Sequence, residues 1–121
     1  MSRTILLVDD SVSIRESVAF FLEQEGFGII KAEDGVQALE ILNKQKPDLI
    51  VTDLHMPNMN GIELIKNIRK STDLSRLPII LLTTETLKEK KIEAKKAGAT
   101  GWLSKPFDKE RLIKVINKLV R

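Results

Sequence analysis

The 121-residue sequence contains no cysteine and no tyrosine, and only one histidine, four phenylalanines and one tryptophan. Without cysteine there is no disulfide framework, no thiolate metal site and no cysteine nucleophile. A single histidine supplies too few nitrogen ligands for the usual zinc sites and argues against a Ser-His-Asp triad. The sequence also lacks an apolar run of about 20 residues and a leader-like N-terminal segment, so we expect no membrane-spanning helix and a cytoplasmic protein.

The formal net charge is only +3, but the charges are segregated along the chain. Residues 1–85 carry 13 acidic and 9 basic side chains, a balance of −4, whereas residues 86–121 carry 4 acidic and 11 basic ones, a balance of +7. The overall excess is too small to indicate nucleic-acid binding. The basic C-terminal part is either an ordinary solvated surface or a face that meets an acidic partner protein. Its residues include Lys88, Lys90, Lys91, Lys95, Lys96, Lys109, Arg111, Lys114, Lys118 and Arg121.

Five short apolar runs alternate with stretches of helical periodicity. The runs are continuous rather than alternating in polarity, which is typical of strands covered on both faces of a parallel sheet. Five such units predict an α/β fold, (βα)5, with a single doubly wound five-stranded parallel sheet and right-handed crossovers. In the fourth helical stretch, Leu87–Ala97, Ile92 is the only large apolar residue after Leu87, so we expect this helix to be the least firmly held. The runs are Ile5–Val8, Gly28–Ile30, Leu49–Val51, Ile79–Leu82 and Trp102–Leu103.

Polar residues of matching chemistry follow four of the five runs. Ligands of open parallel sheets bind beyond the carboxyl ends of the strands, and there the sequence places Asp9 and Asp10, then Asp53, then Thr83, then Lys105. Each residue alone has an ordinary explanation, such as a helix cap or a strand end. Because residues of compatible chemistry follow four of the five strands, we favour a common binding site over four separate explanations.

The residue types restrict the chemistry of that site. Three clustered carboxylates repel one another unless a cation joins them, and oxygen ligands suit Mg²⁺. A Mg²⁺ ion, a lysine and a threonine hydroxyl would neutralise and orient a phosphoryl group. No Gly-x-x-x-x-Gly-Lys loop is present to hold a nucleotide, so we expect the phosphoryl group to arrive on another donor. Ionised Asp53 needs no general base to attack phosphorus and form an aspartyl phosphate.

Four blocks of the sequence closely resemble the receiver domain of two-component response regulators. They are Leu7–Ser11, Asp53–Gly61, Thr83–Glu85 and Gly101–Phe107, and the resemblance spans essentially the whole chain. It implies one receiver domain over residues 1–121, with the flavodoxin-like strand order 2-1-3-4-5. The segment Gly98–Trp102, together with Asp10, Ser11 and Arg15, is most similar to the stand-alone chemotaxis type.

The resemblance implies a phosphoryl-accepting site. Asp53 would be the phosphoacceptor, with a histidine kinase as donor. Asp9, Asp10, Asp53 and the main-chain carbonyl of His55 would hold Mg²⁺. Thr83 would hydrogen-bond the phosphoryl group and Lys105 would pair with one of its oxygens.

It also implies roles around that site. The Lys105–Pro106 bond is expected to be cis. Trp102 stands at the position of the family's switch aromatic, which would turn inward when Thr83 moves toward the phosphoryl group. His55 and Glu85 stand where the family varies, and we expect their side chains to tune dephosphorylation.

Output is expected through a protein partner bound on the face of the fourth helix, fifth strand and fifth helix. The flagellar motor switch is one such target, and a phosphatase is a further candidate partner. We expect a signalling switch in chemotaxis rather than an enzyme, monomeric when unphosphorylated, with no nucleic-acid or membrane partner.

Other functions remain open at this stage. The chain could be a phosphorelay intermediate or a phosphate sink of another two-component pathway, or a degenerate receiver that only binds protein. A flavin-binding module shares the architecture, but Asp9 and Asp10 put negative charge where a flavin phosphate needs a hydroxyl- and glycine-rich cradle. Phosphatases of the aspartyl-phosphate class need a second Asp two residues after the nucleophile, where this chain has His55.

Overall fold

The computed structural model describes residues 3–120, and within them five parallel strands form one sheet. The strand order is 2-1-3-4-5, as expected, and every neighbouring pair is parallel. Because the strands are parallel and in this order, the carboxyl ends of the first, third and fourth lie side by side. The strands are β1 (Thr4–Val8), β2 (Gly28–Ala32), β3 (Leu49–Thr52), β4 (Ile79–Thr83) and β5 (Gly101–Ser104).

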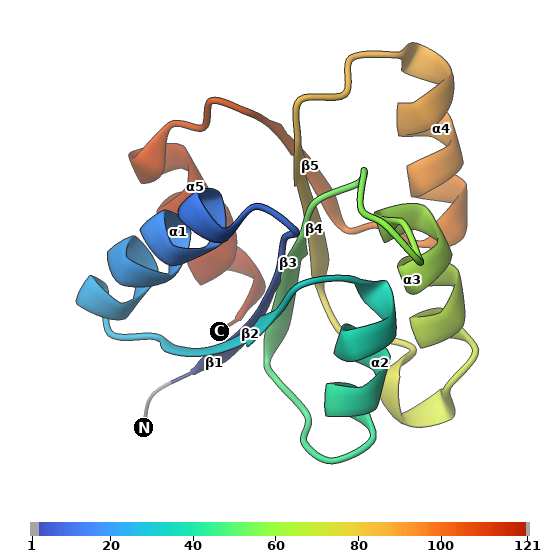
Figure 1. The fold of residues 1–121 in the computed structure, drawn as a ribbon, viewed down its shortest axis with the longest axis horizontal. Helices are drawn as coiled ribbons and strands as arrows, with labels where there is room; N and C mark the ends of the chain where they lie inside the picture. Colours follow the sequence, from blue (N-terminus) through green and yellow to red (C-terminus); the bar gives the residue numbers. More distant parts are fainter. Residues whose placement is uncertain (1–2, 121) are drawn as a thin grey trace.

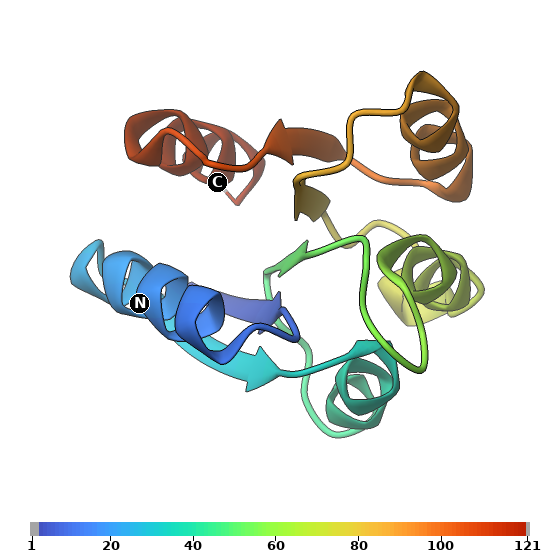
Figure 2. The same ribbon diagram turned by 45° about the horizontal axis from the view of Figure 1, so that its top comes forward.

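Helices cover both faces of the sheet, which gives three layers (Figures 1 and 2). Two helices, α1 (Val12–Gln24) and α5 (Lys109–Leu119), pack on one face. The other face carries α2 (Gly35–Leu42), α3 (Gly61–Arg69) and α4 (Lys88–Ala97), with a short 3-10 turn, η1 (Thr72–Leu74), after α3. Within residues 3–120, none of the helices combines the length and apolar content that a membrane span requires.

Side-chain alternation explains why the apolar runs are continuous. In β1, Ile5 and Leu7 belong to the core on the α1/α5 face, whereas Leu6 and Val8 belong to the core on the other face. The expected burial on both faces is correct for β1, β3 and β4. It is wrong for the two edge strands: the run Gly28–Ile30 of β2 is only partly buried and Trp102 of β5 is half-buried, since an edge strand has a neighbour on one side only.

The helices begin at side chains that accept hydrogen bonds from their first turns. Ser11 accepts from Ile14 at the start of α1, and Asn60 and Glu63 form a reciprocal capping box on α3. Helix α4 differs, because Leu87 precedes it without a side-chain cap and Ala94 is its only buried residue. Helix α4 therefore has the fewest buried residues of the α-helices in residues 3–120, and the expectation that it is the least firmly held stays a prediction.

Candidate functional site

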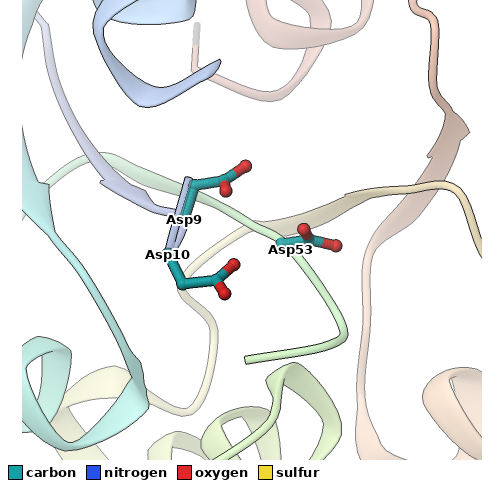
Figure 3. Close-up of side chains that lie close together, drawn as sticks. All are labelled: Asp9, Asp10 and Asp53. Carbon is teal, nitrogen blue, oxygen red and sulfur yellow. The ribbon is translucent and has the colours of Figure 1, made fainter. Parts of the chain in front are cut away.

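The five predicted site residues meet at the carboxyl edge of the sheet. Asp9 and Asp10 follow β1, Asp53 follows β3, Thr83 ends β4 and Lys105 follows β5. Figure 3 shows the three carboxylates pointing into the same space, and one oxygen of each lies within 4.8 Å of the others. The sheet order therefore brings together residues that are up to 96 positions apart in the sequence.

The Lys105 ammonium lies between two of these carboxylates. Its Nζ donates to Oδ2 of Asp9 at 2.9 Å and to Oδ2 of Asp53 at 3.0 Å, and its side chain is 9% exposed. Burial alone would lower the pKa of Lys105, but the two carboxylates outweigh it, so the pKa is raised above its ordinary value. The Lys105–Pro106 bond is cis, as the resemblance implied. The backbone N–H of Lys105 also donates to the carbonyl of Thr83, at 2.9 Å.

Asp53 is held at both ends of its carboxylate. Oδ1 accepts from the backbone N–H of Leu54 at 2.6 Å, while Oδ2 accepts from Lys105. Its own N–H donates to the carbonyl of Val8, which fixes the loop against β1. The first residue of α3, Gly61, packs so closely on this loop that a Cβ there would collide with the carbonyl oxygen of Asp53. The side chain stays 14% exposed, so it is not fully shielded from solvent.

Thr83 is fully buried at the end of β4, and its hydroxyl oxygen accepts from the N–H of Glu85 at 3.1 Å. Trp102 lies half-buried on the α2–α4 side of the sheet, with the ammonium of Lys91 5.7 Å from its ring centre. Its indole N–H is buried and, among residues 3–120, has no hydrogen-bond partner. Its expected role as a switch stays a prediction.

Three contacts around the site were not predicted from the sequence. Nε2 of His55 lies 2.8 Å from Oε1 of Glu85, which joins the loop after β3 to the loop after β4. Arg15 donates from α1 to the carbonyl of Asp9 at 2.7 Å. Asn58, at a φ of 68°, donates to the buried carboxylate of Asp34 at 2.8 Å. Each contact includes at least one loop residue, and sequence periodicity carries no signal for the course of a loop.

The donor set fits a hard divalent cation. Asp9, Asp10 and Asp53 offer carboxylate oxygens only, and such ligands suit Mg²⁺ or Ca²⁺ rather than softer metals. The imidazole of His55 lies against Glu85 instead, and the role of its main-chain carbonyl that the resemblance implied stays a prediction. A cation here would offset the mutual repulsion of three carboxylates, which Lys105 offsets only in part.

Known proteins share both this sequence pattern and this fold. Residues 5–117 match the response regulator receiver domain. Over 120 residues the chain is 42% identical to chemotaxis protein CheY-3 of Vibrio cholerae, covering 95% of this chain and 92% of that protein. It superposes on the structure of chemotaxis response regulator CheY4 of Vibrio cholerae with a TM-score of 0.91 and 43% identity, over 98% of this chain and 99% of that one.

A further structure is the receiver domain of sensor histidine kinase PA1611 from Pseudomonas aeruginosa, which holds a magnesium ion in its active site cleft. Its TM-score is 0.92 at 28% identity, over 99% of this chain and 98% of that one. The similarity therefore covers nearly the full length of each compared chain, which in the last case is a receiver domain. The chain belongs to the response regulator receiver domain family, and its close homologues are stand-alone chemotaxis response regulators of the CheY type.

Proposed function

We propose that the chain is a phosphorylation-activated signalling switch, one receiver domain over residues 1–121, in which Asp53 accepts a phosphoryl group from a histidine kinase. The observation that carries this proposal is the Lys105 ammonium, which lies within 3.0 Å of both Asp9 and Asp53 in a largely buried position. A fixed cation beside one carboxylate of an acidic cluster is suited to pair with an oxygen of a phosphoryl group attached there. The product is a changed surface rather than a released compound, so we class the protein as a switch and not an enzyme.

Mg²⁺ is the proposed cofactor. Asp9, Asp10, Asp53 and the main-chain carbonyl of His55 would hold it, and the clustered carboxylates support this assignment. When bound, the ion supplies positive charge to the oxygens of the transferring phosphoryl group. The ion in the active site cleft of the PA1611 receiver domain gives further support.

The proposed transfer is a displacement at phosphorus. A carboxylate oxygen of Asp53 forms the new O–P bond while the P–N bond of the donor phosphohistidine breaks. The bonding electron pair leaves with the imidazole, which takes a proton from solvent. Lys105 then pairs with one phosphoryl oxygen and the hydroxyl of Thr83 donates to another, so both residues favour the phosphorylated form.

The side chains beside the site have proposed regulatory roles. His55 is exposed and Glu85 half-buried, and together they lie at the rim beyond Asp53 and Thr83. We assign them to the tuning of dephosphorylation. Trp102 is the proposed switch aromatic, which turns inward when Thr83 moves toward the phosphoryl group.

Output would leave through the face of α4, β5 and α5. A groove of about 390 Å³ lies beside Trp102 on this face, and Lys91 and Arg111 contribute to its lining. The basic residues named above for the C-terminal part lie on α4 and α5, except Arg121, which is outside the described residues. We propose an acidic partner protein in the cytoplasm, such as a flagellar motor switch protein in chemotaxis, with a phosphatase as a further partner. Neither nucleic acid nor membrane binding is part of the proposal, and the unphosphorylated form is proposed to be monomeric.

Intact mass spectrometry tests the transfer. The chain is incubated with acetyl phosphate in Mg²⁺ or in EDTA, beside Asp53→Asn and, as a control, Asp73→Asn, which alters an exposed acid in η1. We expect a phosphoryl mass gain in Mg²⁺ for the wild type and the control. We expect none in EDTA and none for Asp53→Asn. Equal labelling of Asp53→Asn and wild type would refute the assignment.

A further inference from the structure

The two halves of α4 are held by different kinds of contact. At its carboxyl end, Ala94 is buried and the carbonyl of Gly98 accepts two hydrogen bonds from Arg69 of α3, at 3.1 and 2.8 Å. At its amino end, Leu87 and Ile92 are 53% and 46% exposed, and no side chain caps the helix. The burial of Ala94 and the two bonds from Arg69 therefore hold the carboxyl end of α4. The amino end has little apolar packing, so polar contacts matter more there.

Glu85 supplies those polar contacts. Its Oε2 accepts from the backbone N–H groups of Thr86 at 2.9 Å and Leu87 at 3.0 Å, the two residues that lead into α4. Its negative charge also lies close to the amino end of the helix, where the helix dipole favours an anion.

Two further bonds join Glu85 to the site. Its Oε1 lies 2.8 Å from Nε2 of His55, two residues beyond Asp53, and its N–H donates to the hydroxyl of Thr83 at 3.1 Å. The loop after β3 and the end of β4 thus both bond to one residue. Glu85 is also bonded to Leu87 at the start of α4, the helix with the fewest buried residues.

We propose that Glu85 is a positioning residue that ties the start of α4 to the loop after β3 through His55, so that the first turns of α4 loosen when the His55–Glu85 contact is lost. The consequence of this link for signalling rests on the proposed function. When Asp53 is phosphorylated, His55 and Thr83 move, Glu85 moves with them, and the start of α4 changes position as a result. This role differs from tuning dephosphorylation, because it changes the output face in the absence of any phosphoryl group.

Amide hydrogen exchange of the full unphosphorylated chain tests this link from His55 through Glu85 to α4, called the tie below. Glu85→Ala, Glu85→Gln, His55→Ala and the double variant are compared with Thr84→Ala, a matched control at an exposed neighbour. We expect exchange at residues 90–93, the first amides of α4 with backbone acceptors, to rise about tenfold in Glu85→Ala, because hydrogen bonds to a charged acceptor are among the stronger ones. Glu85→Gln keeps a neutral acceptor and restores part of the protection, and exchange in the strands stays at the wild-type level in every variant.

The double variant separates a tie from a local loop effect. His55→Ala raises exchange at residues 90–93 severalfold alone, and adds nothing in the Glu85→Ala background, because the contact is already absent there. Exchange in Glu85→Ala equal to that in Thr84→Ala would overturn the inference. So would fully additive effects of the two substitutions.

Failure of this inference and failure of the proposed function give different results. If wild-type chain gains no phosphoryl mass but the variants expose α4, the proposed function fails and the tie stands. If the mass is gained and α4 exchange is the same in all variants, the function stands and the tie is overturned. If the mass is gained and wild-type α4 then exchanges as fast as unphosphorylated Glu85→Ala, both are supported.

Discussion

The ammonium of Lys105 lies 3.0 Å from Oδ2 of Asp53, although 52 positions separate the two residues in the sequence. The contact exists because β3, β4 and β5 are neighbours and all end at the same edge of the sheet. It places a nearly buried cation against the proposed phosphoacceptor before any phosphoryl group arrives.

Removal of this cation should weaken the fold most when no metal is present. Lys105→Met leaves Asp9 and Asp53 without their ammonium partner, so we expect the free energy of unfolding in EDTA to fall by about 1–3 kcal/mol. Added Mg²⁺ should recover part of this loss by neutralising the same carboxylates. Urea unfolding with and without Mg²⁺ measures both effects, with Lys118→Met as an exposed control. An equal loss in both buffers would contradict the electrostatic explanation.

The pH dependence of stability should identify the contribution of Asp34. This buried carboxylate caps α2 by accepting from Gln37 and also accepts from Asn58, and these bonds hold its pKa below the ordinary value of 3.8. A lowered folded-state pKa gives stability that is present above pH 3.8 and is lost as the pH falls through the folded-state value. We expect Asp34→Ala to cost about 1–2 kcal/mol at pH 7.

Unfolding of wild type and Asp34→Ala at lower pH checks in which direction the contribution of Asp34 to stability changes. The stability difference between wild type and Asp34→Ala should shrink as the solution is acidified below pH 3.8. Unfolding curves from pH 7 downward supply the measurement, and Asp73→Asn controls for the loss of one acidic charge. A difference that grows toward low pH would be inconsistent with the hydrogen bonds described.

The sequence predicts the layers of this fold better than its loops. Continuous apolar runs indicate buried parallel strands because both faces of β1, β3 and β4 pack against helices. The sparse apolar content of Leu87–Ala97 predicts the weak packing of α4 for the same reason. The strand order came from the family resemblance, since the lengths and periods of the elements fit other orders of five parallel strands.

The convergence of Asp10, Asp53 and Lys105 could also be predicted, because each follows a strand of the same sheet. The His55–Glu85 contact could not, since it depends on the directions that two loops take after their strands end. The burial of Trp102 at the edge strand β5 likewise depends on where α4 lies, and nothing in the helix pattern specifies that position.

The glycine at the start of α3 should be required for the geometry of the acceptor loop. A Cβ at Gly61 would overlap the carbonyl oxygen of Asp53 and approach a methyl of Leu81 to 2.9 Å. We expect Gly61→Ala to cost about 1–3 kcal/mol, the usual range for overpacking, and to slow labelling by acetyl phosphate.

A matched substitution is available in β5. At Gly101 a Cβ would meet only Cγ1 of Ile80, at 3.8 Å, which is ordinary contact. Gly101→Ala should therefore change stability and labelling much less than Gly61→Ala. Thermal unfolding and labelling rates measure both variants, and similar losses would show that close approach to Asp53 is not the cause.

The basic output face should make partner binding sensitive to salt. If an acidic partner binds over α4 and α5, added salt screens the attraction and the affinity falls severalfold. Charge reversal at Arg111, beside the groove next to Trp102, should weaken binding and reduce the salt dependence. Binding of the phosphorylated chain to a flagellar motor switch protein, measured by calorimetry at several salt concentrations, provides the test. A salt-independent affinity would exclude an electrostatic contribution of this face.

The central claim is that Asp53 itself carries the phosphoryl group, and locating the modification tests it most directly. The Mg²⁺-treated chain is labelled with acetyl phosphate, the acyl phosphate is reduced with borohydride to a stable homoserine, and the product is fragmented by tandem mass spectrometry. Our account predicts that the modified residue is Asp53, with Asp9 and Asp10 unchanged. A modification at Asp9, Asp10 or His55 with Asp53 intact would contradict it.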